Sequence, residues 1–212
     1  MTNSTVNLTA PQAAAIAKVA CSIGAAAGVA VLCGPAGVGK TTVLQQLAPD
    51  PRVAHDELPI RDVVAWLATT GDLPSIVLVD DAHLASDHDL VQLLIRANAR
   101  RPAASVVLAG QGRLLTLVAR DRRIEQAVRI RAALLPGSLV DTAALVPAIT
   151  PADGPRFAEA AIVAIHEIAG GVPGDVVRLA ELAGLVGAEL ADGPITADDI
   201  EAVHRRLAPQ AA

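Results

Sequence analysis

The segment Gly34–Thr41 reads G-P-A-G-V-G-K-T and constrains the fold of this chain more than any other stretch. It matches the pattern G-x-x-x-x-G-K-[ST], in which glycines let the backbone turn until several N–H groups face one phosphate chain. The pattern predicts that Lys40 reaches the β- and γ-phosphates of a nucleotide and that the Thr41 hydroxyl binds Mg²⁺. The predicted cofactor-binding residues are Gly34, Pro35, Ala36, Gly37, Val38, Gly39, Lys40, Thr41 and Thr42.

The residues on either side give this P-loop its expected context. Residues 28–33 form a short apolar run that predicts a buried strand, and residues 42–47 predict the helix whose N-terminus faces the phosphates. Lysine occurs only at Lys18 and Lys40, so a chance match to the pattern is improbable. A plain glycine-rich turn before a helix is the alternative, and the strand–loop–helix order argues against it.

Strands and helices alternate through the first 135 residues. Such alternation predicts an α/β fold, with a parallel sheet flanked by helices on both faces. Besides 28–33, strands are expected at 75–81, 104–110 and 127–132, and a short one at 52–54. Helices are expected at 9–26, 42–47, 60–69, 87–100 and 112–119.

From Pro136 onward the pattern is helical only. Four helices separated by Gly and Pro are expected, at 138–149, 155–169, 175–190 and 196–207. The chain is therefore predicted to have two domains. Residues 1–135 would form the P-loop α/β nucleotide-binding domain, and residues 136–212 a helical lid.

Composition excludes some classes of protein. Hydrophobic residues make up 52% of the chain, but the most apolar stretch, 13–33, contains Lys18 and two glycines, so no membrane insertion is expected. The N-terminus lacks the basic segment of a signal peptide. Cys21 and Cys33 are expected to be buried, reduced thiols, and a cytoplasmic location is predicted.

Charge is distributed unevenly along the chain. Between Arg96 and Arg131 nine arginines and two acidic residues give a net charge of +7, whereas the remainder carries −12 and the whole chain −5. A basic band in an acidic protein indicates a face that meets something negative. Nucleotide phosphates of a neighbouring subunit, nucleic acid and the acidic part of another copy are the candidates.

Two adjacent carboxylates end the expected strand 75–81. Asp80 is predicted to hold Mg²⁺ through water beside Thr41, as in a Walker B strand, and Asp81 to polarise the attacking water as a catalytic residue. A solvated turn is the alternative for the pair. Its position about 40 residues after the P-loop favours the catalytic interpretation, more strongly for Asp80 than for Asp81.

Three further catalytic candidates are weaker. Gln111 follows the strand at 104–110, where it could contact the γ-phosphate or the water, or simply occupy a tight Gly-Gln-Gly turn. Arg122 and Arg123 could lie at a solvated helix end or supply an arginine finger to the next subunit.

A second metal site is not expected. Zinc sites have characteristic ligand spacings, and none of them fits His83, Asp87, His88 and Asp89. These residues predict a solvated loop instead.

With these motifs the chain resembles the AAA+ ATPases, and among them it is most similar to the ExeA-type ATPases of the general secretion pathway. The likeness covers residues 8–207 and rests on the P-loop, V-D-D-A-H-L at 79–84, L-A-G-Q at 108–111, R-I-E-Q at 123–126 and I-A-G-G-V-P at 168–173. It implies a AAA+ architecture, the cofactors ATP and Mg²⁺, a homo-oligomer or a protein partner, and mechanical work on that partner.

The chain departs from this family pattern at three places. Asp81 stands where the family usually has Glu, Ala127 follows Gln126 where an Arg is usual, and Gly174-Asp175 replaces the arginine of the lid motif G-x-P-R. Arg122 or Arg123 is expected to substitute for the finger, and Arg178 for the lid arginine. Together the departures predict a slow ATPase, or a nucleotide that acts chiefly as a switch.

Four functions remain open at this stage. The leading one is a slow AAA+ ATPase that changes subunit or partner contacts as it binds and hydrolyses ATP. An ATP-dependent DNA-binding regulator, similar to the transposition ATPases, is supported by the basic band and opposed by the net charge of −5. A non-hydrolysing nucleotide sensor is the third, and a small-molecule P-loop kinase, against which the helical lid argues, is the fourth.

Overall fold

The computed structural model describes residues 7–25, 28–50, 60–68, 74–99, 103–151, 154–189 and 193–207. The chain divides into two compact units. An α/β unit comprises residues 11–135, and a helical unit comprises residues 136–212 together with residues 1–10.

The α/β unit is built on a four-stranded parallel sheet with the order β2-β3-β1-β4. The strands are β1 (Val29–Cys33), β2 (Ile76–Val79), β3 (Ser105–Gly110) and β4 (Val128–Ala133). The first three are almost continuously buried, as expected for strands covered on both faces. In β4 only Ala132 is buried, and Arg129 and Arg131 are exposed.

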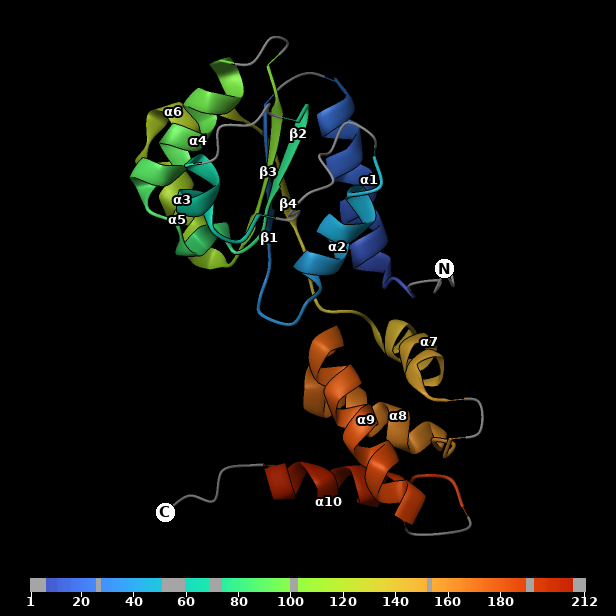
Figure 1. The fold of residues 1–212 in the computed structure, drawn as a ribbon. Helices are drawn as coiled ribbons and strands as arrows, with labels where there is room; N and C mark the ends of the chain where they lie inside the picture. Colours follow the sequence, from blue (N-terminus) through green and yellow to red (C-terminus); the bar gives the residue numbers. More distant parts are fainter. Residues whose placement is uncertain are drawn as a thin grey trace, which may run out of the picture. The chain divides into compact units, whose positions relative to one another are not determined.

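Helices cover both faces of this sheet, which confirms the predicted α/β class (Figure 1). One face packs against α1 and α2, and the other against α3 to α6. The bounds are α1 (Ala10–Ala25), α2 (Lys40–Leu47), α3 (Val63–Leu67), α4 (Asp87–Ala99), α5 (Gly112–Arg120) and α6 (Arg122–Ala127), with a 3₁₀ turn, η1 (Ala82–Leu84), after β2.

Two local predictions in this unit are wrong. The helix expected from Ile60 begins at Val63, because Asp62 caps it by accepting a hydrogen bond from the Ala65 N–H, while Ile60 forms a parallel bridge to Val79. Helix α6 was not expected, since six residues are too few to show a helical period. The strand expected at 52–54 lies outside the described residues.

The helical unit has a core of its own. Its helices are α7 (Leu139–Ile149), α8 (Glu159–Ala169), α9 (Pro173–Glu189) and α10 (Ala197–Leu207). Ser138 and Asp141 form a capping box at α7, and the Thr196 and Asp199 side chains pair in the same way at α10. The helix expected from 155 begins only at Glu159, because Phe157 bridges Ile195 instead.

Both cysteines are free thiols, but Cys21 is exposed and Cys33 half-buried, so the expectation that both are buried is wrong. Burial raises the pKa of the Cys33 thiol, and the nearby Lys40 partly opposes that rise. Within the described part of the chain, no helix combines the length and the apolar character that crossing a bilayer requires.

Candidate nucleotide-binding site

The P-loop connects the end of β1 to the start of α2, at the carboxyl edge of the sheet. Gly37 and Gly39 have φ angles of 73° and 95°, in the left-handed region that glycine adopts without strain. Gly34 lies so close to the backbone after β4 that a Cβ there would be 2.5 Å from the Leu134 carbonyl oxygen. Its N–H donates to the Gly110 carbonyl at 3.2 Å. The start of the loop therefore packs against the ends of β3 and β4 as well as following β1.

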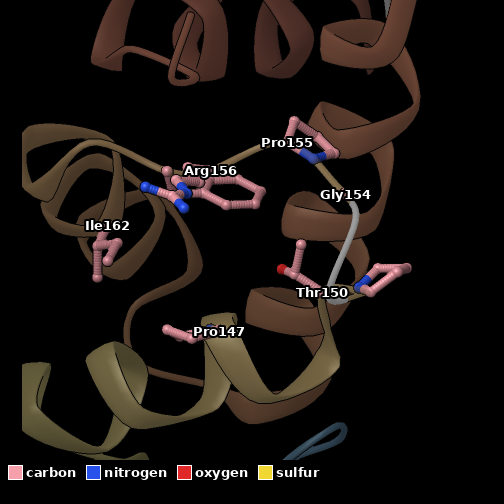
Figure 2. A pocket seen from close by; sticks show the side chains of 8 residues that line it. Pro147, Thr150, Gly154, Pro155, Arg156 and Ile162 are labelled. Carbon is pink, nitrogen blue, oxygen red and sulfur yellow. The ribbon is translucent and has the colours of Figure 1, made fainter.

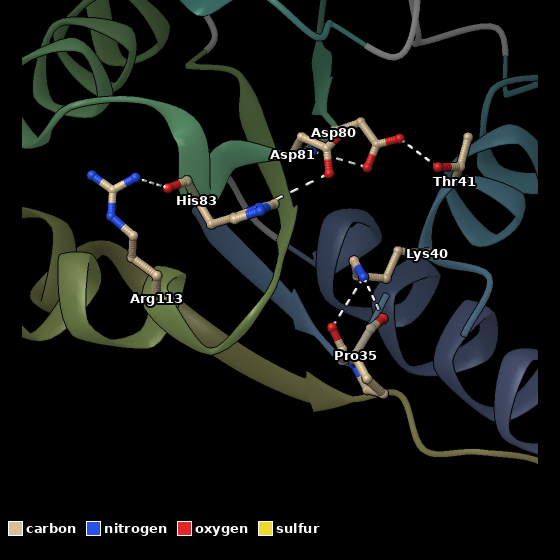
Figure 3. A network of polar contacts seen from close by, with 8 residues as sticks. Pro35, Lys40, Thr41, Asp80, Asp81, His83 and Arg113 are labelled. Carbon is tan, nitrogen blue, oxygen red and sulfur yellow. Dashed lines mark hydrogen bonds and ion pairs between the residues drawn. The ribbon is translucent and has the colours of Figure 1, made fainter. Parts of the chain in front are cut away.

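Lys40 folds back onto its own loop (Figure 3). Its Nζ donates to the carbonyl oxygens of Gly34 at 3.0 Å and Pro35 at 2.7 Å. Burial lowers the pKa of Lys40, and the charges of Asp80 and Asp81 oppose this shift. A buried ammonium group at the mouth of a glycine loop is suited to a polyanion, because an anion restores the solvation that burial removes.

The two predicted magnesium ligands are in direct contact. The Thr41 hydroxyl donates to Asp80 Oδ2 at 2.6 Å, and Asp80, at the end of β2, is only 2% exposed. The second oxygen of Asp80 accepts from the Asp81 N–H at 3.0 Å. A hydroxyl and a carboxylate oxygen side by side fit Mg²⁺, which takes oxygen ligands and keeps several waters or phosphate oxygens.

No other metal site is apparent in the described ranges. Nowhere in them do three or more His, Cys, Asp or Glu side chains gather as ligands would. Ser86 instead caps α4, since its hydroxyl oxygen accepts from the Asp89 N–H and the Asp89 carboxylate accepts from the Ser86 N–H and hydroxyl. His88 is exposed on the same helix.

Asp81 adopts an unusual backbone conformation beside Asp80. Its φ of 48° makes it the one non-glycine residue with a positive φ among the described residues. Its side chain is 44% exposed, and its Oδ1 lies 3.9 Å from His83 Nδ1. A carboxylate this exposed, one residue from the predicted magnesium ligand Asp80, is accessible to water.

His83 does not lie in a solvated loop, so that prediction is wrong. The residue is 9% exposed, and its Nδ1 has no hydrogen-bond partner among the described residues. The reason is that η1 packs against β3 and α5. A Cβ on Gly110 would be 3.2 Å from the His83 Cβ, and Arg113 Nη1 donates to the His83 carbonyl.

Gln111 lies at the same edge of the sheet as the P-loop. It directly follows Gly110, whose Cα is paired with that of Cys33 at the end of β1. Gln111 is exposed and occupies the N-cap position of α5, but its side chain makes no capping hydrogen bond. The Gln111 side-chain amide therefore lies at the edge where a ligand of the P-loop would bind.

Arg122 and Arg123 are not brought to this site. Helix α5 starts at the P-loop edge, and α6 follows it and ends just before β4 begins, at the far end of the sheet (Figure 1). Arg123 forms a bidentate pair with Asp121, with Nη2–Oδ2 and Nε–Oδ1 distances of 2.6 and 3.0 Å. Arg122 is exposed. Neither arginine can serve the P-loop of its own chain.

In the helical unit, Gly174 occupies the position of the missing lid arginine, in the first turn of α9. Arg178, the expected substitute, is exposed and pairs with Asp175 at 3.2 Å on the same helix.

The helical unit also contains an apolar cavity of about 340 Å³ lined by Pro147, Phe157 and Ile162 (Figure 2). Arg156 is the one ionisable side chain among its described lining residues.

Gln12 lies next to the P-loop but was not predicted as a site residue. Gln12 in the first turn of α1 is 4% exposed, and its Nε2 donates to the Val38 carbonyl at 3.1 Å. A signal existed, because Gln12 continues at helical spacing the buried stripe of Ala15, Val19 and Ile23. A polar residue on a buried helical stripe requires a partner.

No family model and no curated protein matches the sequence. Solved structures do match. The RuvB Holliday junction branch migration motor of Thermotoga maritima superposes with a TM-score of 0.67 at 17% identity, over 92% of this chain and 67% of RuvB. The chain has the AAA+ fold. At identities this low, the similarity establishes the fold alone.

Two other solved structures extend the same conclusion. Hsp104, in a closed state with ATPγS and casein, gives a TM-score of 0.62 at 18% identity, over 92% of this chain and 42% of Hsp104. The AAA domain of FIGL-1, solved in complex with ADP, gives 0.59 at 16% identity, over 89% of this chain and 74% of that domain.

Proposed function

We propose that this chain binds Mg–ATP in its P-loop and hydrolyses it slowly, and that the bound nucleotide switches its contacts with another subunit or a protein partner. The observation that carries the proposal is the contact between Thr41 and Asp80, which sets two magnesium-type oxygen ligands beside the loop that contains Lys40. The ADP complex of FIGL-1 and the ATPγS complex of Hsp104 show that chains with this fold hold adenine nucleotides.

Each side chain would have a separate task. Lys40 would exchange its bonds to the Gly34 and Pro35 carbonyls for the phosphate oxygens. Thr41 and Asp80 would hold Mg²⁺, which when bound neutralises charge on the β- and γ-phosphates. Asp81 would orient and polarise the attacking water, with Gln111 as a second polar contact at the same edge.

Slow turnover is expected from what surrounds these residues. The Asp81 carboxylate is one methylene shorter than the usual Glu, which moves it from the position that the family uses. Gly174 stands where the family usually has its lid arginine, so that charge is missing from the motif. The finger must then come from another subunit, and we assign Arg122 to that role rather than Arg123, which Asp121 already binds.

The direct test is nucleotide binding and turnover by purified protein. Lys40→Ala should lower ATP affinity at least about tenfold, because a charge-assisted contact to phosphate is lost. Lys18→Ala, which removes the chain's other lysine from an exposed position, is the matched control. Asp81→Asn should retain binding and lower turnover by about 100-fold. Equal ATP affinity in the Lys40 and Lys18 variants would overturn the proposal.

A non-hydrolysing sensor is distinguished by the same experiment. It is motivated by Ala127 and Gly174 in place of the usual arginines, and it predicts tight ATP binding with background turnover that Asp81→Asn leaves unchanged. We also propose a finer kinship with the ExeA-type ATPases, on the basis of the sequence motifs, and a cytoplasmic location, on the basis of the two free cysteines.

A DNA-binding regulator is the second candidate, favoured by one specific observation. Arginines are exposed on three consecutive elements of the α/β unit, namely Arg120 on α5, Arg122 on α6, and Arg129 and Arg131 on β4. Duplex-DNA binding measured across a salt series, with and without ATP, tests it. A steep salt dependence supports the DNA function, and no binding at low salt rejects it.

A further inference from the structure

The outer side of the P-loop is contacted by a side chain from a different helix. Gln12, in the first turn of α1, donates through Nε2 to the Val38 carbonyl at 3.1 Å. The two residues are 26 positions apart in the sequence, and both are buried, Gln12 to 4% and Val38 to 0% exposure. This bond therefore joins the loop to an element that no nucleotide motif includes.

The direction of the Val38 carbonyl matters for anion binding. A loop that cradles phosphates points its N–H groups inward, so the carbonyls of the same peptides must turn outward. A buried outward carbonyl needs a donor, since leaving it unpaired is costly. Gln12 supplies that donor at Val38, two residues before Lys40.

The next residue in the loop shows how closely the amide fits. Gly39 has a φ of 95°, and a Cβ there would lie 2.1 Å from Gln12 Nε2. The glycine is thus required both by its left-handed backbone and by the amide packed against it. Gln12 fills the space that a side chain at position 39 would occupy.

We propose that Gln12 is a positioning residue that fixes the Val38–Gly39 peptides so that the loop is already shaped for phosphate before nucleotide binds. The inference rests on the proposed nucleotide binding and adds to it a residue outside the P-loop motif. Pre-organising the loop lowers the conformational cost of binding, so its effect should grow with the number of phosphates contacted.

The test uses the full chain and three variants. Gln12→Glu keeps the size of the side chain but cannot donate when ionised, and Gln12→Met keeps its length without a polar group. Val19→Ala is the matched control, because Val19 is fully buried on the same face of α1 but lies two turns farther along it. Affinities for adenosine, ADP and ATP are measured by calorimetry well below each variant's Tm.

We expect both Gln12 variants to lose about tenfold in ATP affinity, less for ADP, and little for adenosine. In turnover assays KM should rise while kcat changes little. Val19→Ala should lower Tm with less than about a threefold change in ATP affinity. The methionine variant keeps the test available if the buried glutamate unfolds the protein.

Wild-type affinity in the Gln12 variants overturns the inference alone, as does a loss that is equal for adenosine and ATP or is matched by Val19→Ala. Failure of the wild-type protein to bind ATP overturns the proposed function, and this inference with it.

Discussion

The Thr41 hydroxyl and the Asp80 carboxylate are joined by a hydrogen bond of 2.6 Å although 39 residues separate them in the sequence. The contact exists because β1 and β2 both end at the carboxyl edge of a parallel sheet, with β3 between them. Thr41 is the second residue of α2, the helix after β1, and Asp80 directly follows β2. Sheet topology alone thus assembles a pair of oxygen ligands next to the phosphate loop.

If Thr41 and Asp80 hold Mg²⁺ as proposed, ATP binding should depend on magnesium. Asp80→Asn and Thr41→Ala should each lower the gain in ATP affinity that Mg²⁺ provides by about tenfold, and change affinity in EDTA much less. Titration calorimetry with and without Mg²⁺ measures that gain. Thr116→Ala, at an exposed threonine of α5, is the control. An unchanged magnesium dependence in the Asp80 variant contradicts the assignment.

Substitutions of Asp81 should affect stability and turnover in different ways. A non-glycine residue with a φ of 48° carries backbone strain, somewhat less for Asp than for most residues. Asp81→Gly should therefore raise the free energy of unfolding relative to Asp81→Ala by about 1 kcal/mol, while both variants lose turnover. Denaturant melts and ATPase assays measure the two effects. Equal stability of the two variants would show that the strain is absent.

Lys40 should leave a signature in the pH dependence of stability. Its pKa is lowered in the folded protein, chiefly by burial, so the unfolded chain binds more protons between the folded pKa and 10.5. Stability from this group therefore rises with pH across that window, and is lowest where Lys40 is charged in both states. The difference in unfolding free energy between wild type and Lys40→Met, measured from pH 8 to 10.5, should grow in favour of wild type. A flat difference contradicts the shift.

Arg122 and Arg123 form a matched pair for testing the finger. Because Arg123 is held by Asp121, Arg122→Ala should lower turnover of the assembled protein by 100-fold or more, whereas Arg123→Ala should have a small effect. ATP affinity should stay the same in both. A larger loss in the Arg123 variant would reverse the assignment.

The Asp121–Arg123 pair also makes a prediction of its own. The side-chain hydrogen bond from Arg123 lowers the pKa of Asp121 to about 2. A lowered carboxyl pKa contributes stability above about pH 4, and that contribution is lost as the pH falls toward 2. NMR titration should find the Asp121 pKa raised in Arg123→Ala but still below 3.8, because the backbone N–H of residue 123 continues to donate to the carboxylate. A pKa that stays near 2 in the variant means that another group causes the shift.

The sequence predicted best where a single physical pattern dominates. The buried strands β1, β2 and β3 are apolar runs, so their positions and the parallel sheet followed directly. Helix α6 is too short for a period, and its cap, Asp121, looked like part of a charged surface. His83 looked polar and solvated, because only the packing of η1 on β3 and α5 reveals its burial.

The partners of side chains were harder to foresee than the elements that carry them. Arg123 is bound by a neighbour two residues away, and Gln12 bonds to a carbonyl 26 residues away. Neither distance is encoded in a motif. Both depend on how helices settle against the sheet, which a single sequence does not specify.

The carbonyl oxygens of Gly34 and Pro35 compete with a phosphate chain for the ammonium group of Lys40. An incoming phosphate chain must displace the Gly34 and Pro35 oxygens, and a departing one leaves them ready to recapture the ammonium group. In the proposed function, nucleotide binding would exchange the ligands of the Lys40 Nζ rather than fill an empty position. Release of the nucleotide would then not require the ammonium group of Lys40 to return to bulk water.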